Sequence, residues 1–277
     1  MRKAVIALLL IAGVTACDRK QESGEVAVSA TPAQLTFDGA DYKDEASKIA
    51  HGRRLAVVLD CTGCHGADMQ GKNVTADDPS YGQMNAPNVT LLLAKYSDAD
   101  FDRLIRHGVP KDAREFWFMP VESFQFLSDA DLSAITAYLR SFKPAGTRLP
   151  PITKGKGFHE DVARGFLDAQ SQVRRYRETQ PVDIGPQHSK GRYLVKVICT
   201  ACHNGQLEGY RDFTPDLDIA GAYSDAELTR LLSTGEGKVK KNLGMMSEMG
   251  RDHFSSLTPN ERQTIVSYLK ARAERPQ

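Results

Sequence analysis

The chain has 277 residues, 41% of them hydrophobic and 26% charged, which is typical of globular proteins and excludes disorder throughout. It carries 36 basic and 35 acidic residues, and removal of residues 1–16, which hold two basic residues and no acid, would leave 34 against 35. A net charge near zero gives no general attraction to phosphate groups, so we expect no nucleic-acid partner.

The N-terminus has the features of an export signal. A basic start, Met1-Arg-Lys3, precedes an apolar run from Ala4 to Val14 that only Gly13 interrupts. This run is too short for a membrane-spanning helix, which needs ~20 residues, but it suits the core of a signal peptide. It ends in Val14-Thr-Ala-Cys17, which resembles the bacterial lipoprotein signal. We therefore expect a signal peptide at residues 1–16 and lipid on Cys17; an ordinary signal peptide with an incidental cysteine is the alternative.

A lipid on Cys17 would anchor the chain to a membrane, because two or more acyl chains hold a protein there stably. Asp18 resembles the residue that retains Gram-negative lipoproteins in the inner membrane. This resemblance implies the periplasmic side of the bacterial inner membrane. The residues that follow are rich in Ser, Gly, Thr, Pro, Ala and acids, so we predict a lipidated flexible tether over residues 17–44.

Three segments occur twice in the same order, which predicts two copies of one structural unit. Cys61-Thr-Gly-Cys-His65 matches Cys199-Thr-Ala-Cys-His203, 138 residues later. Tyr96-Ser-Asp-Ala-Asp100 matches Tyr223-Ser-Asp-Ala-Glu227, and Leu127-Ser-Asp-Ala-Asp131 matches Leu257-Thr-Pro-Asn-Glu261. Because the three offsets differ, we expect insertions in loops between the repeated segments.

The repeated segments have the signals of helices. Ser224 with Glu227, and Thr258 with Glu261, have the spacing of a capping box, and Pro259 falls at a first helical position. Apolar residues follow at helical spacing in two places: Ile49, Ala56 and Leu59, and Leu132, Ile135, Leu139 and Phe142. No segment shows the sustained alternation of a strand. We therefore predict an all-α fold.

Residues 144–186 are predicted to link the two units, with prolines at both ends. Within them Val162, Phe166, Val173 and Tyr176 have helical spacing, and arginines lie nearby at Arg164, Arg174, Arg175 and Arg177. A connecting helix packed across both units is the favoured interpretation. A basic docking surface is the alternative.

The Cys-x-x-Cys-His motifs carry the chemistry. The motif is typical of covalent c-type haem attachment, in which two thiols bond the haem and the histidine binds its iron. With five cysteines and seven histidines in the chain, chance would produce about 0.002 matches. A zinc site would need further Cys or His ligands, and a thioredoxin-like pair would need a βαβ context. We therefore expect two covalently bound haems, on Cys61, Cys64 and His65 and on Cys199, Cys202 and His203.

With these motifs the chain resembles a class I cytochrome c tandem, similar to the haem subunits of bacterial alcohol and related dehydrogenases. The resemblance implies two tandem cytochrome c domains, residues 45–143 and 187–277. It implies a downstream methionine as the sixth iron ligand, which Phe118-Met119-Pro120 matches in the first domain. It also implies that the carbonyls of Pro87 and Pro215 bind the iron-ligating histidines, although Pro87 requires a long insertion.

Three methionines compete as the sixth ligand of the second haem. The internal repeat favours Met249, which lies eight residues before Leu257 as Met119 lies before Leu127. Many related domains instead have a Gly-x-Met pattern followed by a small residue and Glu, which Gly244-Met-Met-Ser-Glu248 matches. The resemblance therefore favours Met246 as the ligand, with Met249 as an apolar core residue and Met245 third.

Iron held by His and Met has no open coordination position, so it can exchange electrons without binding a substrate. We therefore expect an electron-transfer protein without catalytic residues, acting alone or as a subunit of an oxidoreductase complex. Its partners would be a redox donor and acceptor: a dehydrogenase, an oxidase or another cytochrome. The alternative is a dihaem peroxidase or a thiosulfate-oxidising enzyme, although no cysteine is left over for the ligand that the latter uses. The remaining histidines have no expected partner: His51, His107, His159, His188 and His253.

Overall fold

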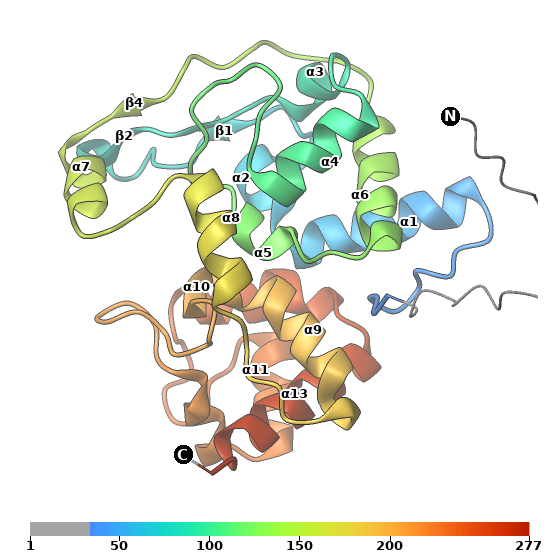
Figure 1. The fold of residues 1–277 in the computed structure, drawn as a ribbon, viewed down its shortest axis with the longest axis vertical. Helices are drawn as coiled ribbons and strands as arrows, with labels where there is room; N and C mark the ends of the chain where they lie inside the picture. Colours follow the sequence, from blue (N-terminus) through green and yellow to red (C-terminus); the bar gives the residue numbers. More distant parts are fainter. Residues whose placement is uncertain (1–33, 277) are drawn as a thin grey trace, which may run out of the picture. The chain divides into compact units, whose positions relative to one another are not determined.

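The computed structural model describes residues 34–276, and most of its ordered elements are helices (Figure 1). The first repeat, residues 45–143, contains α1 (Glu45–Val58), α2 (Cys61–His65), α3 (Val89–Leu93), α4 (Asp98–His107), α5 (Val121–Phe124) and α6 (Asp129–Arg140). The second repeat, residues 187–277, contains α9 (Ser189–Ile198), α10 (Thr200–His203), α11 (Asp225–Thr234), α12 (Met245–Glu248) and α13 (Pro259–Ala273). The all-α prediction is confirmed.

Short elements complete the described part of the chain. Four strands of two residues form two antiparallel pairs: β1 (Lys72–Asn73) with β3 (Asn85–Ala86), and β2 (Gly82–Gln83) with β4 (Thr153–Lys154). The remaining short helices are η1 (Pro79–Tyr81), η2 (Pro186–His188), η3 (Leu217–Ala222), the π-helical turn η4 (Met249–His253) and η5 (Phe254–Ser256). The strands lie in the insertion of the first repeat and in the linker.

The helix boundaries follow local signals in the sequence. The Ser224 and Thr258 side chains cap α11 and α13, and Glu227 and Glu261 complete the predicted capping boxes. Such caps satisfy backbone N–H groups that the helix leaves without partners. At the other end, α4 stops at Gly108, which adopts the left-handed conformation expected of a helix-ending glycine.

The same pair of helices packs together in both repeats: α1 against α6, and α9 against α13. A glycine allows the close approach each time. A Cβ on Gly52 would lie 1.9 Å from the carbonyl oxygen of Ala134, and one on Gly191 would lie 2.6 Å from that of Thr264. These two glycines therefore mark equivalent positions in α1 and α9. Between them and the cysteines, the first repeat has one extra residue, Asp60, which adopts a left-handed conformation.

The linker contains two helices rather than the single predicted one, α7 (Lys156–Ala163) and α8 (Ala169–Glu178). The break comes after α7, where Gly165 has a φ of +103° and the N–H of Phe166 closes the turn on the carbonyl of Asp161. Because the chain reverses there, Val162 and Tyr176 do not share one helix face as their spacing predicts.

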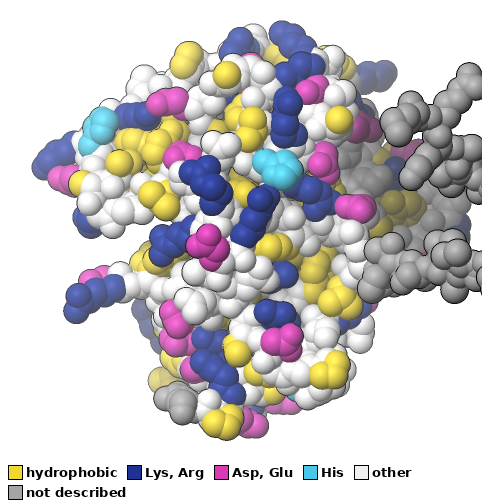
Figure 2. All heavy atoms as spheres, viewed as in Figure 1, with side chains coloured by type: hydrophobic (Ala, Val, Ile, Leu, Met, Phe, Trp, Pro, Cys, Tyr) yellow, Lys and Arg dark blue, Asp and Glu magenta, His cyan; other side chains and the backbone are white. Residues whose placement is uncertain are grey.

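Helix α8 nevertheless packs across both repeats, as expected. The Gln125 side chain of the first repeat donates a hydrogen bond to the Val173 carbonyl. Tyr176, 2% exposed, donates one to the carbonyl of Thr200 in the second repeat. Arg177 binds Gln125 and the carbonyl of Arg106, so part of its basic charge is used within the fold. Figure 2 shows acidic side chains interspersed among the basic ones on the face over α4 and α8.

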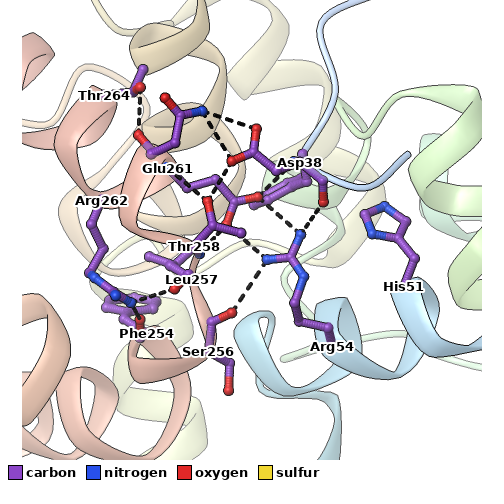
Figure 3. Close-up of polar contacts among 12 residues, drawn as sticks. Asp38, His51, Arg54, Phe254, Ser256, Leu257, Thr258, Glu261, Arg262 and Thr264 are labelled. Carbon is purple, nitrogen blue, oxygen red and sulfur yellow. Dashed lines mark hydrogen bonds and ion pairs between the residues drawn. The ribbon is translucent and has the colours of Figure 1, made fainter. Parts of the chain in front are cut away.

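The N-terminal end of the described chain binds both repeats (Figure 3). Phe37 is 1% exposed, and its N–H donates a hydrogen bond to Asp131 of α6. The N–H of Asp38 donates to Glu261 of α13, and its carboxylate pairs with Lys190 of α9. The predicted flexible tether, residues 17–44, therefore ends too late, because buried and hydrogen-bonded residues already occur at 37 and 38. The predicted signal peptide and Cys17 lie outside the described residues.

Candidate functional site

Both Cys-x-x-Cys-His motifs form a single helical turn after a longer helix. Cys61, Cys64 and His65 lie in α2, and Cys202 and His203 lie in α10, which Cys199 precedes. The four motif cysteines are free thiols. Burial raises the pKa of Cys61 and of Cys199 to about 12.

Each motif histidine is held by a proline carbonyl. The Nδ1 of His65 lies 2.9 Å from the oxygen of Pro87, and the Nδ1 of His203 lies 2.9 Å from that of Pro215. A carbonyl only accepts hydrogen bonds, so the proton of each ring is on Nδ1 and the lone pair of Nε2 is free. Burial lowers the pKa of both rings, which favours the neutral form that binds metal. Both predicted histidine–proline pairs are confirmed.

A glycine that the sequence patterns did not single out shapes each histidine loop. The N–H of Gly71 donates a 2.7 Å hydrogen bond to the His65 carbonyl, and the N–H of Gly209 donates a 2.9 Å bond to that of His203. Both have a positive φ, and a Cβ at either position would lie within 2.7 Å of the proline that holds the histidine. The sequence does contain one sign of these glycines, because each lies six residues after the histidine of its motif.

A comparison of the two histidine loops shows where the first repeat has extra residues. Pro215 follows Gly209 by six residues, whereas Pro87 follows Gly71 by sixteen. The ten extra residues lie in the segment that forms β1, η1, β2 and β3. Met69 occupies the place of Leu207, since both are 0% exposed, have a positive φ and lie four residues after the histidine. Met69 is therefore a core residue and not a candidate ligand.

The candidate methionines differ in exposure. Met119, Met246 and Met249 are partly buried against the hydrophobic core, whereas Met245 is 53% exposed. A methionine that binds iron in a dry pocket must lie inward, so the exposure of Met245 disfavours it. Met246 lies inside α12 and Met249 begins η4, and both are partly buried, so burial does not decide between them.

The two motifs adjoin through α5, the helix that begins two residues after Met119. The hydroxyl of Ser123 in α5 lies 2.8 Å from that of Thr200, inside the second motif, and both side chains are buried. The pKa of Cys202 is raised by burial and by the negative charges of Glu122 in α5 and of Asp60, which precedes the first motif. The structure thus brings groups from both sites together, a contact that the sequence did not predict.

The donor set fits a covalently attached haem at each motif. Two free thiols lie beside a neutral histidine whose Nε2 lone pair is available, and partly buried methionines occur downstream. Within residues 34–276, no three His, Cys, Asp or Glu side chains gather in a way that could hold a metal ion directly. A zinc interpretation therefore has no support in the described chain.

Other histidines have structural partners that the sequence did not indicate. The Nε2 of His51 lies 2.8 Å from Asp131, and both side chains are buried. The Nδ1 of His253 donates a hydrogen bond to the carbonyl of Val57, and its Nε2 lies 3.3 Å from Asp60. His107, in the last turn of α4, binds Arg177 of α8. The contacts of His51 and His107 join helices, and those of His253 bind Val57 and the residue that precedes the first motif.

The family model for cytochrome c matches residues 49–143 and 189–273. A subunit of the nicotinate dehydrogenase of Pseudomonas putida is 26% identical over 265 residues, which cover 84% of this chain and 22% of that protein. The fructose dehydrogenase cytochrome subunit of Gluconobacter japonicus is 24% identical, over 80% of this chain and 52% of that protein. The gluconate 2-dehydrogenase cytochrome c subunit of Pantoea cypripedii is 23% identical, over 84% and 61% respectively.

The chain therefore spans between about a fifth and three-fifths of the length of these relatives. The two matched regions coincide with the two sequence repeats, and each contains one Cys-x-x-Cys-His motif. None of the helices described between residues 34 and 276 is both long and apolar enough to span a membrane.

Proposed function

The chain belongs to the cytochrome c family, and on this premise we propose that it relays electrons between two redox proteins through two covalently attached haems. It is an electron-transfer protein rather than an enzyme in its own right. The observation that carries the proposal is the pair of buried histidines, each oriented by a proline carbonyl and each preceded by the two cysteines of its motif. Two tandem cytochrome c domains, residues 45–143 and 187–277, would each hold one haem.

We assign the residues as follows. Cys61 and Cys64 would attach the first haem, with His65 and Met119 as the axial ligands. Cys199 and Cys202 would attach the second, with His203 and Met246 as ligands. Bound in this way, a haem supplies iron that changes its charge by one electron. The hydrogen bonds from Nδ1 to Pro87 and Pro215 keep the rings in the tautomer that presents Nε2.

The contact between the two sites supports a relay inside one chain. Ser123 lies four residues after Met119 and its hydroxyl touches that of Thr200, between the two cysteines of the second motif. Buried, hydrogen-bonded groups around this contact hold α5 against α10 and exclude water. An electron that enters at one site could therefore reach the other through a short, rigid connection.

We further propose that the chain works at the periplasmic side of the bacterial inner membrane, anchored by lipid on Cys17. The sequence Val14-Thr-Ala-Cys17 and the following Asp18 support this location. The names of the relatives, which are subunits of nicotinate, fructose and gluconate dehydrogenases, support a dehydrogenase as the electron donor. An oxidase or another cytochrome would accept the electrons.

Haem attachment is tested by mass and by extraction. The intact mature chain should exceed its polypeptide mass by two haems, and acidified acetone should remove neither. Cys61→Ala with Cys64→Ala should lose one haem, and Cys199→Ala with Cys202→Ala the other. A wild-type chain with one haem, or with haem that the solvent extracts, would contradict the assignment.

The anchor and the partner need separate experiments. Cys17→Ser should release the protein from membranes with its haem content unchanged, whereas Ser23→Ala, in the same segment, should remain bound. Retention of Cys17→Ser on the membrane would contradict the lipid anchor. Pull-down from detergent-solubilised membranes should recover a dehydrogenase that reduces the chain in the presence of its own substrate; recovery of partners that neither reduce nor oxidise the chain would contradict the relay.

A further inference from the structure

We propose that Phe118 is a positioning residue for Met119, and that an aromatic cluster around Phe118 holds Met119 toward the first haem site. The cluster consists of Tyr81, Trp117, Phe118, Phe158 and Phe166. This inference rests on the proposed role of Met119 as an iron ligand. It predicts that the two sites hold their methionines with different rigidity.

The backbone around Met119 turns sharply on both sides. Phe118 has a φ of +67°, and the N–H of Met119 donates a 2.8 Å hydrogen bond across it to the carbonyl of Trp117. Pro120 has φ −78° and ψ 54°, and the N–H of Val121 donates a 2.7 Å bond across it to the carbonyl of Met119. Met119 thus lies between two three-residue turns that use both its backbone N–H and its carbonyl.

The first turn is unfavourable for the residue that makes it. A side chain as large as Phe at positive φ costs conformational free energy that glycine would not incur. Such a conformation persists only where the surrounding structure fixes it. The side chain of Phe118 must therefore have contacts that offset this cost.

Those contacts come from other aromatic rings. The ring centroid of Phe118 lies 5.2 Å from Phe166, 5.5 Å from Tyr81 and 6.2 Å from Phe158. Trp117 adds a 5.0 Å edge-to-face contact with Phe158, which is 2% exposed. Aromatic pairs at these separations attract one another beyond the area that they bury. Phe118 is 39% exposed, so these ring contacts act on one part of its side chain. Together with those of Trp117, they support the turn that precedes Met119 at two consecutive residues.

The rings are supplied by two segments that the second repeat lacks. Tyr81 belongs to the ten-residue insertion of the first repeat, and Phe158 and Phe166 belong to the linker. The two segments are joined by the pairing of β2 with β4 and by a hydrogen bond from the Tyr81 hydroxyl to Asp161. In the described chain no aromatic pair of this kind includes a residue between Val239 and Phe254, the segment that holds Met246 and Met249. The first site therefore has a dedicated support for its methionine.

The test measures the weak long-wavelength iron–sulfur band, the two haem potentials and the NMR methyl signals of the ligated methionines. Met119→Ala first identifies the share of the first haem and should remove about half of the band. Phe118→Ala should lose much of the first haem's part of the iron–sulfur band and lower the potential of that haem. Alanine at position 118 still has an unfavourable positive φ but lacks the ring contacts that offset it. Phe118→Gly should retain more of the share than Phe118→Ala, since glycine adopts positive φ freely.

Phe166→Leu removes one ring contact without changing residues 117–119. It should reduce the first haem's part of the iron–sulfur band by less than Phe118→Ala does. This variant keeps the test decisive if Phe118→Ala does not fold. Phe213→Ala, an exposed phenylalanine in the second repeat, is the matched control and should leave the first haem's share unchanged. If Met119→Ala removes the first share but the Phe118 and Phe166 variants keep it, the positioning role is wrong. If Met119→Ala keeps it, the proposed ligand itself is wrong.

Discussion

Arg54 and Tyr193 occupy the same place in the two repeats, and each binds a buried carboxylate in the first turn of a helix of the opposite repeat. Both lie two residues after the close-packed glycine of their helix, in α1 and α9. The Arg54 guanidinium pairs with Glu261 at 2.8 Å, and the Tyr193 hydroxyl donates a 2.9 Å hydrogen bond to Asp131. The same two carboxylates accept the N–H groups of consecutive residues, Phe37 and Asp38. The interface between the repeats thus has approximate two-fold symmetry, with the N-terminal segment bound across it.

This arrangement predicts that Glu261 stabilises the interface as well as its own helix. Its carboxylate is fully buried and accepts hydrogen bonds from Arg54, Asp38 and Thr258 (Figure 3). Glu261→Gln should lower the free energy of unfolding by about 3 kcal/mol, because Arg54 loses its charged partner in a partly buried place. Glu227→Gln changes the equivalent residue of the α11 capping box, which contacts only its own repeat, and should lower the free energy of unfolding by much less. Equal losses in denaturant unfolding would contradict the interface role.

The glycines beside the motif histidines should not tolerate a side chain. A Cβ at Gly71 would lie 2.3 Å from the Ala86 carbonyl oxygen, and one at Gly209 would lie 2.2 Å from that of Thr214. Gly71→Ala and Gly209→Ala should each displace the proline that holds the histidine, destabilise the chain by about 2 kcal/mol or more, and alter the spectrum of one haem. Gly185→Ala is the control, since its φ is also positive but its nearest neighbour is the flexible side chain of Gln187. A spectral change in the control, or none in the two variants, would count against the histidine loops.

Glu122 should make stability depend on pH. Burial raises its pKa from 4.5 to about 7. Below pH ~4.5 the carboxyl is protonated in the folded and unfolded states alike, so its burial has no electrostatic cost. As pH rises from about 4.5 to about 7, Glu122 ionises in the unfolded state but stays protonated in the folded state, so the free energy of unfolding falls. Glu122→Gln should therefore be about 3 kcal/mol more stable than the parent near pH ~8 and should differ little near pH ~4.

The Glu122 experiment needs a control variant that removes a carboxylate at another position. Glu160→Gln, at an exposed position in α7, serves as the matched control for removal of one negative charge. Denaturant unfolding curves across the pH range give the measurement. A gain for Glu122→Gln that is the same at both ends of the range would show that burial does not control this group.

The choice between Met246 and Met249 predicts a clear spectroscopic difference. Met246→Ala should lose the second haem's share of the iron–sulfur band and lower that haem's potential, because methionine ligation raises it. Met249→Ala should keep the band and lose stability as a core residue does. Met245→Ala, at the 53% exposed position, is the control and should change neither. Loss of the band in Met249→Ala alone would show that the internal repeat is the better guide.

Most of the candidate site could be predicted from the sequence because its parts are local. The thiols and histidine of each motif lie within one helical turn, the capping residues act three positions along the chain, and apolar spacing marks the buried helix faces. The Pro215 partner of His203 lies twelve residues away in a tight loop, and the repeat carried the same assignment to Pro87 despite the insertion. Short-range chemistry of this kind depends on neighbours that the chain itself brings together.

Only the tertiary structure decided how the two repeats meet. Three sets of contacts join the repeats: Ser123 with Thr200, Arg54 and Tyr193 with the buried carboxylate of the opposite repeat, and Phe37 and Asp38 with the same two carboxylates. The residues that they join are 62 to 223 positions apart in the sequence. The aromatic cluster around Phe118 likewise combines an insertion with a linker whose chain reversal at Gly165 breaks the expected helix. No local pattern encodes these pairings, because they follow from which faces remain to be buried once the separate helices have formed.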